Sequence, residues 1–279
     1  RPVDLFENDP PRVWVLDYAV ARQPRKTVGL FNWSDREAEI VVPAARLGLD
    51  AKARYAAVEF WSGRAAAPFA GELSARVAPR SCQVLSVRDL GDRPAVLGTS
   101  RHITGGAVDL LDETWDPVAG TLAGASRVVG GDPYEVRVLT ACGQDKITCR
   151  PALRAEVSQA DREAGVKADL ATEGGLVRVR LSSPVSREVR WSVAFGPPRD
   201  EPPPAAVTDL KAEQPEADSP VRLCWNGSGP FYAVRRDGRL LATVGSNQWS
   251  DAEPLANRPC RYEVAAVTFS GQAGPSVRF

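Results

Sequence analysis

Hydrophobic and polar residues alternate along most of the chain, which is the pattern of β-strands with one buried face. The alternation is clearest in five early stretches, at residues 13–20, 27–33, 38–42, 55–61 and 81–87. Their β-branched and aromatic residues are bounded by Gly, Pro, Asp and Asn, which is typical of strands in a sandwich. Helical periodicity is weak, and its best stretch, residues 158–165, fits a turn between strands equally well. The pattern therefore predicts an all-β fold.

Breaks in the strand pattern divide the chain into three consecutive β-sandwich domains. A turn-rich stretch near residues 89–94 ends the first domain, which we place at residues 1–90. The second domain spans residues 91–197 and is followed by a Pro-rich linker at residues 198–204. Clustered prolines impose extended polyproline geometry, so we expect this linker to act as a semi-rigid spacer. The third domain covers residues 205–279.

The amino-acid composition argues against several kinds of binding partner. The chain has 279 residues, with 35 Lys and Arg against 35 Asp and Glu. Zero net charge argues against a nucleic-acid partner, because phosphate binding needs a local surplus of cations. No apolar run approaches the roughly 20 residues that span a bilayer, so we expect no membrane insertion. One His and five Cys leave little material for a zinc site, and the sequence predicts neither a metal site nor a cofactor.

The start of the chain and its residue usage suggest a source. The chain begins at Arg1 and contains no Met, so we expect a fragment or processed product of a longer protein. No signal peptide is present to be read. Arg far outnumbers Lys and Ala is abundant, which is typical of a bacterial genome rich in G and C.

The third domain resembles a fibronectin type III domain over its whole length. Trp225 points inward from the second strand, and the turn Asp237-Gly238 joins two apolar runs as a hairpin. Tyr262 stands at the position of a tyrosine corner, where the ring packs inside and the hydroxyl bonds nearby backbone. The resemblance implies a spacer or a surface attachment of the kind found in bacterial polysaccharide-degrading enzymes. No Arg-Gly-Asp tripeptide supports integrin-type adhesion.

Several motifs of the first two domains occur in the order of a known enzyme family. They are RPVDLFENDPPRVW at residues 1–14, VGLFNW at 28–33, EFW-x-G at 59–63 and PRSCQVL at 79–85. This order resembles the non-catalytic C-terminal region of alpha-galactosidase-like (melibiase-type) glycoside hydrolases, where a β-sandwich follows the catalytic barrel. Residues 95–110 and 120–136 look like sequence found beyond that sandwich in some large bacterial members.

The resemblance implies that catalysis belongs to a separate domain of a longer chain. Such hydrolases cleave a glycosidic bond with two carboxylates, which the family places on a (β/α)₈ barrel. Nothing in this sequence alternates as a barrel does, so we expect no catalytic residue and no catalysis by this chain alone. The expected partner is the catalytic barrel of the same parent chain, and the expected location is extracellular or periplasmic. Leu5, Phe6, Val13 and Trp14 should then include a patch that packs on the barrel.

A carbohydrate-binding role is the alternative, in a stand-alone lectin-like protein that binds galactoside or another glycan. Its candidates are Asp112 and Asp116 beside Trp115, in a stretch expected to be a loop, together with His102, the only histidine. The blander interpretations are a solvated acidic loop and a structural, hydrogen-bonded histidine. A protein-binding scaffold and an enzyme with an unfamiliar site stay open as well. Trp115 and Trp249 are the best candidates for exposed tryptophans, whereas the core is expected to hold Trp33, Trp61, Trp191 and Trp225.

Two cysteines are spaced for a hairpin disulfide. Cys142 and Cys149 flank a short turn between expected strands. A bond between them would stabilise the fold by roughly 2–3 kcal/mol through loop entropy. A pair of reduced thiols fits the same sequence equally well.

Overall fold

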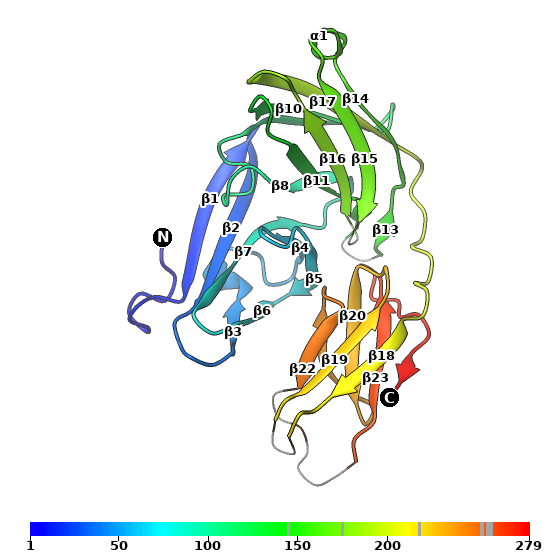
Figure 1. Cartoon of the computed structure of the whole chain (residues 1–279). Coiled ribbons are helices and arrows are strands. Elements are labelled where there is room, and N and C mark those ends of the chain that lie inside the picture. Colours follow the sequence, from blue (N-terminus) through cyan, green and yellow to red (C-terminus); the bar gives the residue numbers. More distant parts are fainter. Residues whose placement is uncertain (144–145, 174–175, 217–218, 252–253, 255–258) are drawn as a thin grey trace.

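The computed structural model describes residues 1–143, 146–173, 176–216, 219–251, 254 and 259–279, and strands dominate it (Figure 1). All sheets are antiparallel. The predicted all-β fold of sandwich domains is therefore confirmed. The ambiguous stretch at 158–165 contains one short helix, α1 (Gln159–Glu163), which begins where the Ser158 hydroxyl accepts a hydrogen bond from the Asp161 N–H at 3.2 Å.

The first sandwich packs a five-stranded sheet, ordered β1-β2-β7-β4-β5, against the ribbon β3-β6. Its elements are β1 (Val13–Val20), β2 (Gln23–Asn32), β3 (Ala38–Pro43), the 3-10 helix η1 (Ala44–Leu47), β4 (Arg54–Glu59), β5 (Ala65–Ala70), β6 (Glu72–Val77) and β7 (Ser81–Asp89). Inner positions of the sheet, such as Val15 and Leu30, form one buried cluster with Ile40 of the ribbon. Because side chains alternate along a strand, Trp14 and Leu16 lie on the outer face.

The second sandwich packs two four-stranded sheets, ordered β14-β17-β10-β9 and β15-β16-β11-β8. Its strands are β8 (Ala95–Thr99), β9 (Leu110–Asp116), β10 (Thr121–Val128), β11 (Tyr134–Leu139), β14 (Ala152–Val157), β15 (Lys167–Glu173), β16 (Leu176–Ser182) and β17 (Arg187–Phe195), with a small ribbon of β12 (Ala141–Cys142) and β13 (Thr148–Cys149). Val136 and Trp191 belong to its core. Within that core the Tyr134 hydroxyl donates to the buried Asp109 carboxylate at 2.7 Å.

The third sandwich packs sheet β18-β19-β22 against sheet β21-β20-β23-β24. Its strands are β18 (Thr208–Glu213), β19 (Val221–Asn226), β20 (Phe231–Arg236), β21 (Arg239–Val244), β22 (Gln248–Asp251), β23 (Tyr262–Val267) and β24 (Val277–Arg278). Trp225 is buried as expected. Tyr262 is buried too, but its hydroxyl donates to the Asp251 carboxylate at 2.8 Å rather than to backbone, because Asp251 faces it from the opposite sheet. The fibronectin type III assignment stays a prediction from the sequence.

Buried charges join the first sandwich to the second. Glu113 of β9 is fully buried and pairs with Arg25 of β2, and its Oε2 also accepts from Arg88 of β7 at 3.0 Å. Both arginines also donate to the Val96 carbonyl of β8, at 2.8 and 3.1 Å. Burial lowers the pKa of Arg25, and the adjacent Glu113 carboxylate opposes that effect. These directional bonds fix how the two sandwiches meet.

A shared hydrophobic cluster holds the third sandwich against the other two. Phe231 and Phe269 pack edge to face at 4.8 Å and belong to the same buried cluster as Ala65 of β5 and Leu139 of β11. Nearby, the Arg76 guanidinium lies 5.2 Å from the Trp249 ring centroid. The third sandwich is therefore docked on the first two, although the Pro-rich sequence before it suggests a spacer.

We expect the Glu113→Ala variant to lose about 3–5 kcal/mol of unfolding free energy, because Arg25 and Arg88 would stay buried without their counter-charge. Chemical denaturation followed by tryptophan fluorescence measures this loss. The matched control is Glu188→Ala, which removes a carboxylate from the exposed pair with Arg127 and should have little effect. Equal effects of the two substitutions would contradict the assigned role of Glu113.

We expect removal of residues 201–279 to lower the melting temperature of the remaining sandwiches and to increase binding of an apolar dye. The reason is that Ala65, Leu139 and Leu176 would lose the cover that Phe231 and Phe269 provide. Calorimetry and dye fluorescence on the shortened chain measure both effects. A truncated chain with the melting temperature and dye binding of the full chain would show that the third sandwich is only tethered.

Candidate functional site

The acidic stretch around Trp115 forms strand β9 rather than the loop that its composition suggests. Asp112 and Asp116 lie on one face of this strand, and Trp115 lies on the other. The Trp115 ring packs against Phe195 at a centroid distance of 6.0 Å, and the Arg150 guanidinium lies over it at 5.5 Å. These neighbours leave Trp115 poorly placed to stack on a sugar.

The other carbohydrate candidates have local structural partners. Asp116 accepts from two backbone N–H groups of the turn after β9, at 2.9 and 3.0 Å. Asp112 accepts from the N–H of the next residue at 2.8 Å. His102 lies in the loop between β8 and β9, with Nδ1 3.1 Å from the Thr104 hydroxyl. Trp115 lies on the other face of β9 from both aspartates, and the carbohydrate role of these residues stays a prediction.

The predicted disulfide falls on the ribbon of β12 and β13. Their register sets Cys149 opposite Ala141 and Cys142 opposite Thr148. Burial raises the pKa of the Cys149 thiol. The side chain of Cys142 lies outside the described residues, so the bond between the two stays a prediction.

A patch of large hydrophobic side chains is left uncovered on the outer side of the first sandwich. Trp14, Trp33 and Trp61 are 43%, 50% and 57% exposed. We call this patch the outer aromatic face, and its members are Trp14, Leu16, Phe31, Trp33, Phe60 and Trp61. The sequence wrongly suggested that Trp33 and Trp61 belong to the core.

The strand register places this face on one continuous surface. Trp14 of β1 pairs with Gly29 of β2, and Gly29 pairs with Val84 of β7. The Val84 carbonyl in turn accepts from the Phe60 N–H at 2.9 Å, just after β4. Three neighbouring strands and the turn after β4 thus contribute to one row across the sheet, and Phe31 follows in the row alongside it.

Glycine at position 29 lets an aromatic ring lie across the sheet. A Cβ at Gly29 would stand only 2.9 Å from the ring of Phe31. The Phe31 ring stacks on Trp33 at a centroid distance of 5.4 Å and an interplanar angle of 9°. Trp33 is held in turn by its indole N–H, which donates to the Pro11 carbonyl at 3.0 Å. The aromatic rings are therefore fixed in position although they are exposed.

The N-terminal segment before β1 is tied down by a buried carboxylate. Asp4 accepts from the Val13 N–H at 3.0 Å and from the Asn8 side chain at 2.8 Å. Beside it, Leu5 is half exposed and Phe6 is fully exposed. Of the four residues proposed to pack on a barrel, Leu5, Phe6 and Trp14 are exposed, whereas Val13 faces the core because it alternates with Trp14.

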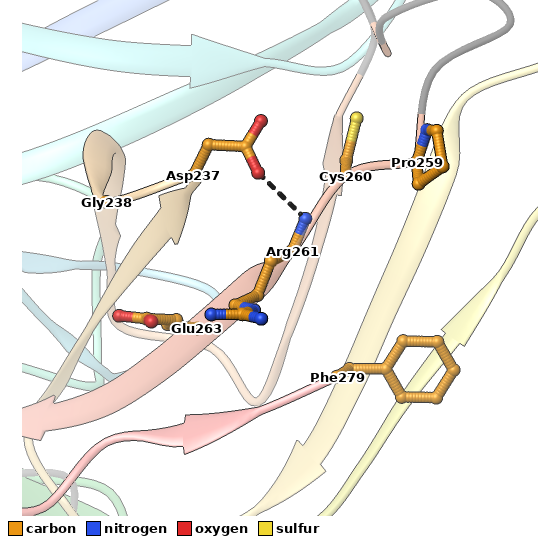
Figure 2. Close-up of a pocket in the computed structure, with 7 residues that line it drawn as sticks. All are labelled: Asp237, Gly238, Pro259, Cys260, Arg261, Glu263 and Phe279. Carbon is orange, nitrogen blue, oxygen red and sulfur yellow. Dashed lines mark hydrogen bonds between the residues drawn. The ribbon is translucent and has the colours of Figure 1, made fainter.

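Two surface hollows lie away from the outer aromatic face. Figure 2 shows the larger, about 530 Å³, where Asp237, Glu263 and Phe279 line the end of the third sandwich. Its acids are engaged, since Asp237 accepts from the Arg261 N–H at 3.0 Å and Glu263 pairs with Arg278 at 2.8 Å. The smaller, about 250 Å³, lies between the N-terminal segment and β3. Neither brings together an acid and a base free to act on a substrate.

Metal-ligand clusters and membrane-spanning helices are absent from the described part of the chain. It contains no group of three or more His, Cys, Asp or Glu side chains that could hold a metal ion. None of the helices within it has the length and hydropathy to cross a membrane.

Comparison with known families finds a match for the first sandwich. This sandwich combines a five-stranded sheet with exposed aromatic side chains. Residues 9–87 match the family described as the alpha galactosidase C-terminal beta sandwich domain. The first sandwich is therefore similar to that domain, and the match covers less than half of the chain. No match to a curated protein was found.

Solved structures give only distant similarities. The spore cortex lytic enzyme SleM of Clostridium perfringens is 19% identical over 36% of this chain and 33% of that chain, with a TM-score of 0.26. The glycoside hydrolase domain of Endo-D from Streptococcus pneumoniae R6 is 13% identical over 67% of this chain and 36% of that chain, also with a TM-score of 0.26. The chain thus spans about a third of the length of these structures, and similarity this low says nothing about function.

We expect the Asp4→Asn variant to be less stable than the parent at neutral pH and nearly as stable in acid. Burial opposes ionisation of Asp4, but hydrogen bonds from Arg12, Val13 and Asn8 outweigh it and lower its pKa. A lowered folded-state pKa means that the stabilisation is present above the unfolded value of about 3.9 and is lost as pH falls through the folded value. Thermal melts from pH 2 to 7 measure the difference.

The control for this series is Asp35→Asn. Its carboxylate forms an exposed pair with Arg80, with both side chains 75% exposed. We expect little effect from this change at any pH. A constant difference between Asp4→Asn and the parent across the pH range would contradict the role given to the ionised carboxylate.

Proposed function

We propose that this chain is the non-catalytic accessory region of a bacterial, alpha-galactosidase-like glycoside hydrolase, and that its outer aromatic face packs on the catalytic barrel of that enzyme. The family match of residues 9–87 supports the class of parent enzyme. The exposure of Trp14, Trp33 and Trp61 carries the docking proposal. An extracellular or periplasmic location is part of the same proposal.

A patch of this kind is costly to leave in water. Burying apolar surface stabilises an association by about 25 cal/mol per Å² before the costs of ordering, and contiguous exposed apolar patches mark interaction sites. Trp is the residue most often found at the energetic centre of protein interfaces. The rings of Phe31 and Trp33 are already ordered by stacking, so little further freedom is lost when a partner covers them.

The arrangement of the rings favours a protein partner over a glycan. A sugar stacks on an open aromatic face and needs convergent polar groups to fix its orientation. Here Phe31 and Trp33 stack on each other, and Phe60 and Trp61 meet edge to face at 5.7 Å. The lectin alternative rested on Trp115, which is packed between Phe195 and Arg150. We therefore favour barrel docking.

The test uses the catalytic domain encoded upstream of Arg1 in the same reading frame, produced as a separate polypeptide. We expect it to bind this chain, and we expect the Trp14→Ala variant to bind at least about thirtyfold more weakly, because truncating a central interface Trp costs about 2 kcal/mol or more. Calorimetric titration measures the dissociation constants. The control Val118→Ala changes a 97% exposed residue in the turn after β9 and should leave binding unchanged.

Two results would overturn the proposal. One is an upstream reading frame without a barrel, or a barrel that does not bind the unaltered chain. The other is turnover of a chromogenic glycoside by this chain alone, abolished by substitution of one of its own acidic residues.

A further inference from the structure

A loop of the second sandwich reaches the rim of the outer aromatic face. This loop, residues 100–109, joins β8 to β9 and is called the His102 loop below. The Thr27 hydroxyl of β2 donates to the Thr104 carbonyl at 2.8 Å, and the Tyr18 hydroxyl of β1 donates to the Gly105 carbonyl at 3.3 Å. The loop therefore lies directly on the outer side of the five-stranded sheet.

The position of the loop on the sheet follows from the register of the strands. Thr27, which anchors the loop, pairs with Leu16 of the outer aromatic face. The next row toward the exposed end holds Trp14 and Gly29. The turn is tight, because the Gly105 N–H donates to the His102 carbonyl at 2.8 Å. The exposed side chains of Trp14 and Leu16 thus extend from the outer aromatic face to the row that anchors the His102 loop.

The tip of the loop is exposed and partly apolar. Ile103 is 48% exposed, and the side chain of His102 is exposed as well. Leu16, in the row of the sheet that anchors the loop, is 40% exposed. The loop and the sheet form two walls of one corner.

Interactions between the two sandwiches fix the angle between the His102 loop and the five-stranded sheet. Close behind the loop, Glu113 of the second sandwich pairs with Arg25 and Arg88 of the first. At the turn between β4 and β5, Arg178 donates to the Gly63 carbonyl at 2.7 Å and Arg137 donates to the Phe60 carbonyl at 3.1 Å. The second sandwich therefore also holds the turn that carries Phe60 and Trp61.

We infer that the catalytic domain sits in this corner, so that His102 and Ile103 of the second sandwich form part of its docking surface together with the outer aromatic face. This inference rests on the proposed function and adds the His102 loop to the proposed docking surface. The occupant is a folded protein domain because the face is continuous with an interface that the same sheet already forms with another sandwich. The second sandwich then helps to select the partner, in addition to bracing the first.

A labelling experiment tests the inference on the unaltered chain. His102 is the only histidine of the chain, so modification by diethyl pyrocarbonate reports on one known position. We expect the rate of His102 modification to fall at least fivefold when the separately produced catalytic domain is added, as read by mass spectrometry of the peptide that contains it. An unchanged rate in a chain that is saturated with the catalytic domain would overturn the inference.

A set of variants separates this inference from the proposed function. We expect Ile103→Ser to weaken binding of the catalytic domain by about tenfold and Ile103→Val to change it little. The control Leu153→Ser alters a 64% exposed residue of β14, which lies at the opposite edge of its sheet from β9. Melting temperatures of the variants should match that of the parent, because Ile103 is half exposed.

Each pattern of results has one meaning. Weaker binding for both Trp14→Ala and Ile103→Ser, with Leu153→Ser unchanged, supports both proposals. Weaker binding for Trp14→Ala alone overturns the two-walled corner and leaves the docking of the outer aromatic face standing. Unchanged binding for Trp14→Ala and Ile103→Ser overturns both.

Discussion

The carboxylate of Glu113 is the interaction on which the arrangement of the molecule depends. It is fully buried between two sandwiches, and its charge is balanced by Arg25 and Arg88, which both come from the other sandwich. Removing such charges from water is costly, so the contact is stable only when all three side chains meet in one geometry. The two sandwiches therefore have one preferred orientation. The position of the His102 loop on the sheet is a direct result of it.

The same rigidity extends to the third sandwich through apolar contacts. Phe231 and Phe269 fill a cluster to which all three sandwiches contribute, and Arg76 of the first lies against Trp249 of the third. Charge pairs orient the first and second sandwiches relative to each other, whereas buried apolar area holds the third sandwich against them. A partner that binds the outer aromatic face would thus meet a preformed surface, because the three sandwiches do not move independently of one another.

Much of the fold was predictable because strands and turns leave a pattern within short stretches of sequence. The alternation at residues 13–20 and 27–33 marks strands wherever the chain places them, and Asp237-Gly238 forms the expected hairpin turn. The exposure of individual tryptophans was not predictable in this way. In β1 both faces carry apolar residues, so the pattern cannot say whether the face of Val13 or that of Trp14 is covered. Only the tertiary arrangement decides that Trp33 is exposed and Trp249 is buried.

The docking of the third sandwich also determines what happens at the borders of the first sheet. A bare edge strand offers unpaired N–H and C=O groups to any other chain, which is a route to fibrils and other aggregates. Strands β20 and β21 lie against β5 at one border, and at the other Val3 and Arg1 bond to the backbone of β1. Part of each border of this sheet is thus covered. By covering part of a sheet edge, the third sandwich would also make the protein less prone to self-associate at high concentration.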